Sequence, residues 1–371
     1  MFSQKAKKHA DACRYCWMCR HLCPIGLKTG KEINTPRAKG LLVAMNERGF
    51  PMDSSAAEAM YECLLCGLCT NDCVTGFDPL IFIREARTEA VVNNLVPPYV
   101  RKVIDRILET GNPFGLPAKK KWDALKDEVA TLPDQADVLL YVGNTAAYRT
   151  PEIAKAVMSL LKKAGISFTV LQNELSSGIE LGDLIGFVEE VRTMAKACAA
   201  AINKIGPKTV VVLDTYDAAC FKHEYQEWNC KIEADVVTAT AFIAELVRNS
   251  KLVIEKRNTV VTYHDSARLA RDLGEHEPAR ELIAATGATL KEMFLNRRLA
   301  KCCGSELVNQ YRPDLTRLTA ESRWEDAIRT GAKALITACP QAYDVLAKAI
   351  PTEMELIDLF RLLDESTNQD K

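Results

Sequence analysis

The sequence predicts an α+β multidomain protein in which a helical, cysteine-rich N-terminal domain precedes two tandem α/β modules with parallel sheets. Eight of the 14 cysteines lie within the first 73 residues, and after residue 135 Val- and Ile-rich runs alternate with helical stretches. A chain of 371 residues is also too long for one core of average size. We therefore expect domains at residues 1–95, 96–135, 136–250 and 251–371.

Proline and glycine mark the helices of the first two regions. Pro36 and Pro79 stand where the first turn of a helix tolerates a missing N–H, and Gly49 can end the first of these helices. The connector between the N-terminal domain and the modules contains one amphipathic helix, YVRKVIDRILETG, and the turn-rich run NPFGLP. These two regions are therefore predicted to be helical.

The remainder alternates strands and helices twice. The first set is VLLYVG, PEIAKAVMSLLKKAG, ISFTVL, a long helix over about 184–204, and TVVVLD. The second set begins at NTVVTYHD and continues through PARELIAATG, ATLKEMF, a helix over about 315–329, and ALITAC. This order is typical of βαβ units on a parallel sheet, and its repetition indicates a duplication with helices on both faces of each sheet.

Charge and hydropathy exclude several classes of protein. The 48 Lys and Arg nearly balance the 49 Asp and Glu, which argues against a nucleic-acid binder. The first residues contain no signal-peptide stretch, and no segment reaches the about 18 uninterrupted apolar residues that a membrane span needs. We expect a cytoplasmic protein in a reducing compartment, with any membrane association peripheral or through a partner.

The strongest motif is Cys-x-x-Cys-x-x-Cys-x-x-x-Cys, which occurs twice without deviation. In two-cluster ferredoxins three thiolates of such a run surround one cubane and the fourth binds the other cluster. We therefore expect two 4Fe-4S clusters in a helical ferredoxin domain. The expected ligands of the first cluster are Cys13, Cys16, Cys19 and Cys73, and those of the second cluster are Cys63, Cys66, Cys69 and Cys23.

Zinc is the alternative metal at these cysteines. Zinc sites usually combine Cys-x-x-Cys elements that supply two ligands each, whereas the two quartets here match the ferredoxin run. Residues 1–48 also carry ten Lys and Arg against three acidic residues. This excess either steers an acidic redox partner or forms a solvated face that offsets the charge of the clusters.

Beyond the clusters, the chain resembles the CCG-domain iron-sulfur proteins, which include the D subunit of heterodisulfide reductase and the iron-sulfur subunit of glycolate oxidase. The resemblance rests on the two ferredoxin motifs, TPRAKG between them, the NPFG connector and the tandem modules. It implies that each CCG-type module has carried a cysteine, then Cys-Cys-Gly, then Cys-Pro-x-Cys.

Both modules depart from that pattern. In the second, CCGS and TACPQAY keep the centre and the close, but Ala267 replaces the opening cysteine and Ala342 the last one. In the first, Asn144 stands at the opening, SSG (176–178) at the centre and DTYD (214–217) at the close. The spacing supports the alignment, because 36 residues separate Ser177 from Asp214 and 35 separate Cys303 from Cys339. Without thiolates, the first module cannot bind a cluster in the family's way.

A third iron-sulfur cluster is a candidate in the second module. Cys302, Cys303 and Cys339 supply three thiolates, and either His264 or an open iron completes the set. The alternative is a group of buried free thiols, since free cysteine behaves as a small apolar residue. Three other cysteines, Cys198, Cys220 and Cys230, are expected in the core.

The sequence and the resemblance together favour an electron-transfer subunit of an oxidoreductase, without a catalytic residue of its own. It would relay single electrons between an acceptor and a flavoprotein, either an FAD-linked 2-hydroxyacid oxidase or an electron-transferring flavoprotein, in a hetero-oligomer. No nucleotide-binding glycine motif follows a strand. The alternatives are a disulfide or thiol reductase acting at the C-terminal site and an assembly scaffold with structural clusters.

Overall fold

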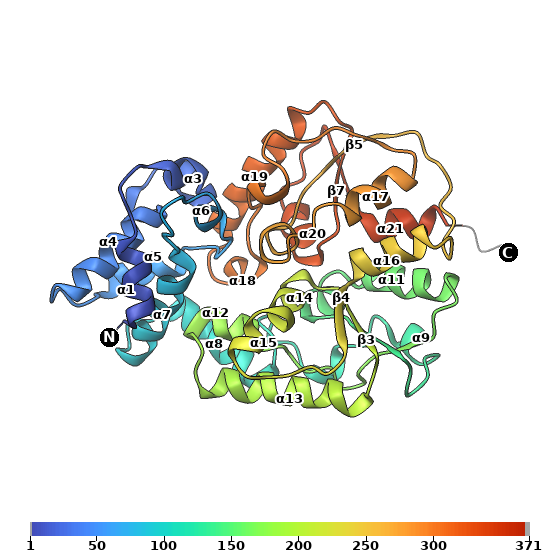
Figure 1. Cartoon of the computed structure of the whole chain (residues 1–371), viewed down its shortest axis with the longest axis horizontal. Helices are drawn as coiled ribbons and strands as arrows, with labels where there is room; N and C mark the ends of the chain where they lie inside the picture. Colours follow the sequence, from blue (N-terminus) through green and yellow to red (C-terminus); the bar gives the residue numbers. More distant parts are fainter. Residues whose placement is uncertain (1, 368–371) are drawn as a thin grey trace.

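The computed structural model describes residues 2–367 and shows a helical N-terminal part beside two stacked α/β layers (Figure 1). In this view the N-terminal helices lie at the left, the first module at the lower right and the second at the upper right. The predicted fold class is thus confirmed. Among residues 2–367, no helix is long and apolar enough to cross a membrane.

Short helices build the N-terminal part. They are α1 (Gln4–Asp11), α2 (Met18–Leu22), α3 (Pro24–Thr29), the 3-10 turn η1 (Glu32–Asn34), α4 (Pro36–Glu47), α5 (Ser54–Tyr61), α6 (Leu68–Asn71) and α7 (Pro79–Val92). Pro36 and Pro79 open their helices as predicted, and the side chains of Thr35 and Asp78 cap the first turns. A small core of apolar side chains, including Phe82, joins these helices.

The connector is formed by helices and turns. It contains α8 (Pro98–Thr110), η2 (Ala118–Lys120) and α9 (Lys126–Val129). The Asn112 side chain fixes the NPFGLP turn, because its amide donates to Leu116 O and its oxygen accepts from the N–H groups of Phe114 and Leu116. The Asn112 side chain therefore gives this turn a defined conformation.

Each module has a four-stranded parallel sheet of the same topology. The first sheet consists of β1 (Val138–Tyr141), β2 (Phe168–Thr169), β3 (Thr209–Val212) and β4 (Asp235–Thr238), in the order β2-β1-β3-β4. The second consists of β5 (Val260–Tyr263), β6 (Thr289–Leu290), β7 (Ala334–Thr337) and β8 (Glu355–Asp358), in the order β6-β5-β7-β8. Consecutive residues are buried along β1 and β3, so both faces of the sheet are covered. The identical order confirms the predicted duplication.

Helices connect the strands of both sheets. The first module has α10 (Asn144–Tyr148), α11 (Pro151–Lys163), α12 (Ile179–Ile185), α13 (Glu189–Ile205), α14 (Thr215–Lys222), α15 (Glu224–Glu227) and α16 (Ala239–Arg248). The second has the π-helical turn η3 (Arg268–Asp272), α17 (Pro278–Ala285), η4 (Arg297–Leu299), α18 (Glu306–Asn309), α19 (Pro313–Ile328), α20 (Pro340–Ala347) and α21 (Leu359–Glu365).

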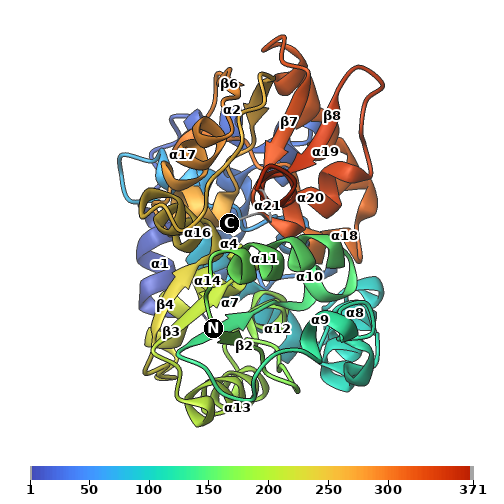
Figure 2. The same cartoon turned by 90° about the vertical axis from the view of Figure 1, so that its right-hand side faces the viewer.

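The two modules pack with approximate two-fold symmetry. Helix α11 of the first contacts α21 of the second, and α17 of the second contacts α16 of the first; these helices lie between the sheets (Figure 2). The elements that follow the central strands also meet, α10 with α20 and α14 with η3. The carboxyl ends of both sheets, where parallel sheets place their sites, therefore face each other.

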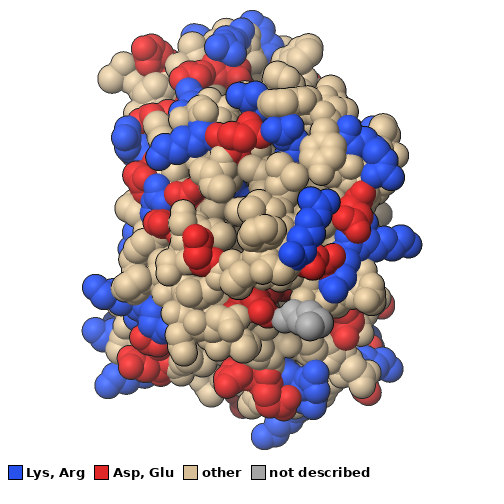
Figure 3. Space-filling model, turned by 90° about the vertical axis from the view of Figure 1, so that its left-hand side faces the viewer, with Lys and Arg blue, Asp and Glu red and all other residues tan. Residues whose placement is uncertain are grey.

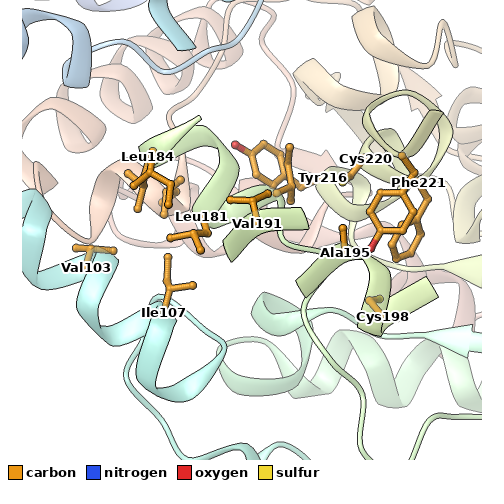
Figure 4. Close-up of a cluster of buried hydrophobic side chains, with 14 of the residues drawn as sticks. Val103, Ile107, Leu181, Leu184, Val191, Ala195, Cys198, Tyr216, Cys220 and Phe221 are labelled. Atoms are coloured by element: carbon orange, nitrogen blue, oxygen red, sulfur yellow. The ribbon is translucent and has the colours of Figure 1, made fainter. Parts of the chain in front are cut away.

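A second core joins the connector to the first module. Val103 and Ile107 of α8 pack against Leu181 and Leu184 of α12, and Val191 of α13 lies beside them (Figure 4). Deeper in the same cluster lie Cys198 and Cys220, and Cys230 is buried as well. These three cysteines are core residues, as predicted.

One helix prediction was wrong. The expected helix over 184–204 is two helices, because α12 ends at Ile185 and α13 begins at Glu189. Gly186 between them has φ 78°, and a Cβ atom there would overlap the Thr88 side chain of α7. The close approach of α7 therefore requires both the break and the glycine.

Replacing Gly186 tests this close approach. Gly186→Ala should lower the free energy of unfolding by about 2–5 kcal/mol, because backbone strain adds to the overlap with Thr88. Gly165→Ala is the matched control: Gly165 has φ 68°, and an added Cβ would meet no atom within 4 Å, so the change should cost only about 1–2 kcal/mol of strain. Anaerobic thermal unfolding of the iron-loaded proteins measures both; equal losses would contradict the packing argument.

Candidate functional site

Both cysteine motifs follow the same backbone course. Tyr15 and Trp17 have φ of 54° and 71°, and at the equivalent positions Leu65 and Gly67 have 50° and 72°. Each pair brackets the second cysteine of its motif, and left-handed residues turn the chain sharply. The third cysteine of each motif then lies in the short helix α2 or α6. The repeated sequence spacing is therefore a repeated loop geometry.

The eight thiols of these loops surround two adjoining cavities. The first cavity is lined by Cys13, Cys16, Cys19 and Cys73 together with Cys69. The second cavity is lined by Cys63, Cys66, Cys69 and Cys23. The fourth cysteine of each motif thus lies at the cavity of the other motif, and Cys69 lies at the wall of both.

The second cavity is deeply buried and bordered by cations. Burial raises the pKa of Cys23 to about 12, and at the first cavity it raises the pKa of Cys19 to about 11, so both thiols need a bound metal ion to ionise at neutral pH. Lys39, 1% exposed, lines the second cavity, and the Arg87 guanidinium donates to Cys63 O at 2.8 Å. These cations can offset the negative charge of thiolate-bound clusters, so the residues present fit iron-sulfur groups.

The geometry does not favour a single metal ion. Within residues 2–367, no three Cys, His, Asp or Glu side chains converge closely enough to hold one ion. The four thiolates of a cubane bind four different irons and stand around it, whereas one zinc draws its four ligands to about 2.3 Å. The thiols line cavities, as a cluster requires.

A third cavity lies where all three parts of the chain meet. Its thiols are Cys302 and Cys303, in the loop before α18, and Cys339, which caps α20. The N-terminal part contributes Leu64, Leu65 and Cys66, the first module Thr215 and Tyr216, and the second module also His264. Ala267 and Ala342, which stand where the family pattern has cysteines, line the same cavity. The sequence alignment is therefore consistent in space.

Cys66 links the second cavity to the third. It lines both cavities, and in the third its side chain lies beside that of Cys302. Arg271 fixes this contact, because its guanidinium donates to Cys66 O at 2.7 Å and to Ala300 O at 2.7 Å. Sequence reasoning missed the link, since nothing in the spacing relates residues more than 200 positions apart.

His264 is oriented by another buried side chain. Arg323 Nε donates to His264 Nδ1 at 3.0 Å, and burial holds the pKa of His264 well below its usual range. A neutral imidazole that accepts at Nδ1 carries its proton on Nε2. His264 would therefore have to give up its Arg323 contact to bind iron.

The first module has oxygen-bearing side chains where the second has thiols. Ser177 Oγ donates to Asp217 Oδ1 at 2.5 Å, and Asn144 Nδ2 donates to Glu180 Oε2 at 2.8 Å. Gln341, from the third cavity, donates to Asp214 at 3.3 Å. Hard oxygen ligands do not suit iron-sulfur clusters, and these side chains hydrogen-bond with one another instead.

Three buried ionisable side chains of this network were missed by the sequence analysis. Lys121 Nζ lies 2.9 Å from Glu174 Oε1, and both side chains are at most 4% exposed. Burial raises the pKa of Glu180 to about 8. The sequence signal was weak, because the two glutamates on either side of SSG lie in a stretch that also contains Gln172, Asn173 and Asp183.

Glu180 should make stability depend on pH. The folded chain holds its proton up to about pH 8, whereas an unfolded chain releases it near 4.5, so the stability it contributes is complete below about 4.5 and is lost as the pH rises to about 8. Glu180→Gln should therefore lose less stability between pH 5 and 8 than wild type, by up to about 1.4 kcal/mol per pH unit. Thermal unfolding at several pH values measures this.

A matched variant controls for the loss of a carboxylate. Glu190 is exposed on α13, so Glu190→Gln should keep the wild-type dependence on pH. The assignment is wrong if Glu180→Gln and wild type respond to pH identically.

Comparisons with known proteins agree with this geometry. Residues 9–77 match the 4Fe-4S dicluster domain, and residues 261–343 match the cysteine-rich domain known as CCG. The D subunit of dihydromethanophenazine:CoB–CoM heterodisulfide reductase from Methanosarcina barkeri is 27% identical, with 96% of this chain and 93% of that protein aligned.

Two longer proteins are also similar. A probable iron-sulfur-binding oxidoreductase, FadF of Bacillus subtilis, is 26% identical over 85% of this chain and 47% of its own length. The EtfAB:quinone oxidoreductase of Syntrophomonas wolfei is 24% identical over 94% of this chain and 56% of its own length. The chain spans about half the length of these two relatives. The chain thus contains two cysteine loops within a match to the 4Fe-4S dicluster domain and a match to the CCG domain, and over nearly its whole length it is similar to the D subunit of heterodisulfide reductase.

Proposed function

We propose that this chain is the electron-transfer subunit of an oxidoreductase complex and holds two 4Fe-4S clusters that exchange single electrons with a flavoprotein. The observation that carries the proposal is the crosswise arrangement of eight thiols around two adjoining cavities. Adjacency matters because electron transfer between centres falls steeply with distance. Cys69, at the wall of both cavities, marks where the two centres would be closest.

The chain's own residues hold, insulate and charge-balance the clusters. Bound clusters supply one-electron exchange. The ligands of the first are Cys13, Cys16, Cys19 and Cys73, and those of the second are Cys63, Cys66, Cys69 and Cys23. Buried Leu68 and Ile83 line the second cavity and exclude water from it. Arg87 and Lys39 counter the negative charge there.

The flavoprotein partner is inferred from the resemblance and the relatives. The name of the Syntrophomonas wolfei relative pairs EtfAB with quinone. No nucleotide-binding glycine motif follows a strand in this chain, so an organic redox cofactor would belong to another subunit. An FAD-linked 2-hydroxyacid oxidase or an electron-transferring flavoprotein would fill this role.

Serine variants of the fourth cysteines test the crosswise ligand sets. Cys73→Ser should release the first cluster and free Cys13, Cys16 and Cys19, whereas Cys23→Ser should release the second and free Cys63, Cys66 and Cys69. Each should reduce the iron content from about eight to about four per chain. Anaerobic alkylation with mass spectrometry identifies the freed thiols.

Cys198→Ser is the control, because Cys198 is fully buried in the core and lines none of the three thiol cavities. It should retain about eight irons. If Cys23→Ser instead frees Cys13, Cys16 and Cys19, each motif binds its own cluster and the crosswise sets are wrong. Stoichiometric zinc in anaerobically prepared protein would overturn the proposal entirely.

A second candidate function is a disulfide or thiol reductase at the third cavity. The contact between Cys66 and Cys302 favours it, because electrons could pass from the second cluster directly to the C-terminal thiols. Reducing one disulfide takes two electrons and two protons, so two single-electron steps would be needed. The relative from Methanosarcina barkeri is named as part of a heterodisulfide reductase.

Iron content distinguishes the two candidates. If the chain is a relay with two clusters, the double variant Cys303→Ser/Cys339→Ser should keep about eight irons and the wild-type rate of reduction by a flavoprotein. A fall from about twelve irons to about eight would instead support a third cluster and the reductase. A scaffold with structural clusters would show no reduction by any flavoprotein.

A further inference from the structure

The surface around the first cavity exposes large apolar side chains. Tyr15 is 49% exposed, Trp17 41%, Met18 54% and Val74 96%. All four line the first cavity, whose volume is about 300 Å³. We call these four residues the entry face. Exposed apolar groups gathered in two adjacent loops mark a contact surface more often than chance exposure does.

The entry face is preorganised. The Arg37 guanidinium lies 3.8 Å from the centre of the Trp17 ring, and that of Arg20 lies 5.1 Å from it. Glu32 in turn forms ion pairs with both arginines. The indole is therefore held in place, and little side-chain entropy is lost when a partner docks on it.

The surroundings of the entry face are basic. Residues 13–37 contain five Lys and Arg and one Glu, whereas residues 63–79 of the second motif contain two Asp and no Lys or Arg. Arg14 is exposed and donates to the carbonyls of Asp11 and Cys13; Asp72 is the acidic residue at the cavity. Figure 3 shows the N-terminal side of the molecule, where uncharged surface is bordered by Lys and Arg with acidic groups between them.

The second cavity is less accessible to a partner than the first. None of its four thiols is exposed, whereas Cys16 at the first cavity is exposed. The second module also packs beside it, because the Tyr311 hydroxyl donates to Tyr61 O at 2.9 Å and Arg271 donates to Cys66 O. A redox protein can therefore come closer to the first centre than to the second.

We propose that Tyr15, Trp17, Met18 and Val74 form the docking face for an acidic redox protein, which exchanges one electron at a time with the first cluster. In each encounter the partner is oxidised by one electron, the first cluster is reduced by one, and no bond is made or broken. The apolar centre excludes water, and the basic border orients the partner. This inference rests on the proposed function.

The test measures reduction of the anaerobic iron-loaded chain by flavodoxin hydroquinone, an acidic one-electron donor, in a stopped-flow instrument. Val74→Asp and Met18→Asp should slow the reaction at least tenfold, because they place negative charge at the centre of the face. Phe294→Asp is the control, since Phe294 is 98% exposed in the second module. It should react like wild type. The wild-type rate should fall as salt is added, and Arg14→Glu should weaken that dependence.

Dithionite, a small reductant, separates docking from damage to the cluster. In excess it should reduce all variants to the wild-type extent, with unchanged electron paramagnetic resonance spectra of the first cluster. If Val74→Asp and Met18→Asp react with flavodoxin as wild type does, or if Phe294→Asp is slowed equally, the docking face is wrong while the clusters stand. If dithionite leaves the wild-type absorption unchanged, the proposed function fails first.

Discussion

The position of the second cysteine loop on the modules depends on one partly buried contact, that of Arg271 with the loop. Arg271 makes it with three backbone carbonyls, those of Cys66, Arg298 and Ala300. Charge-assisted hydrogen bonds of this kind fix position more firmly than apolar packing alone. Without Arg271 the carbonyl of Cys66 would lose this partner, and the second cysteine loop would lose its direct hydrogen bond to the second module.

That contact also explains why the two modules differ. Their carboxyl ends face each other, but it is the second module that places a thiol, Cys302, beside Cys66 of the N-terminal domain. The first module reaches the third cavity through Thr215 and Tyr216, and its Asp214 accepts a hydrogen bond from Gln341 of the second module. The second module has thiols at the third cavity, next to the proposed second cluster. The first module has carboxylates, serine and asparagine at the equivalent positions. Buried polar groups without hydrogen-bond partners are costly. Side chains that hydrogen-bond with one another are therefore a stable way to fill this position in the first module.

Local patterns predicted most of the fold. Proline at the starts of α4 and α7 and alternating apolar runs in the modules are signals carried by a few neighbouring residues. The edge strands β4 and β8 were not predicted, because each is half-exposed and reads as part of the helix that follows it. The break at Gly186 depends on Thr88 of α7, a contact that no local pattern contains.

The candidate site also has features that are local in the sequence and features that are not. Each cysteine motif is local and was predicted, and the assignment of its fourth cysteine to the other cluster follows from the ferredoxin spacing. The link from Cys66 to Cys302 and the buried pair of Lys121 and Glu174 are tertiary contacts, which sequence spacing cannot predict. These contacts arrange the thiols in series: the first cavity has an exposed apolar rim, the second shares Cys69 with the first and Cys66 with the third, and the three cysteines of the C-terminal module at the third cavity are buried. Because Cys16 at the first cavity is exposed and no thiol of the second is, the proposed exchange of single electrons with another protein would begin at the first set of thiols.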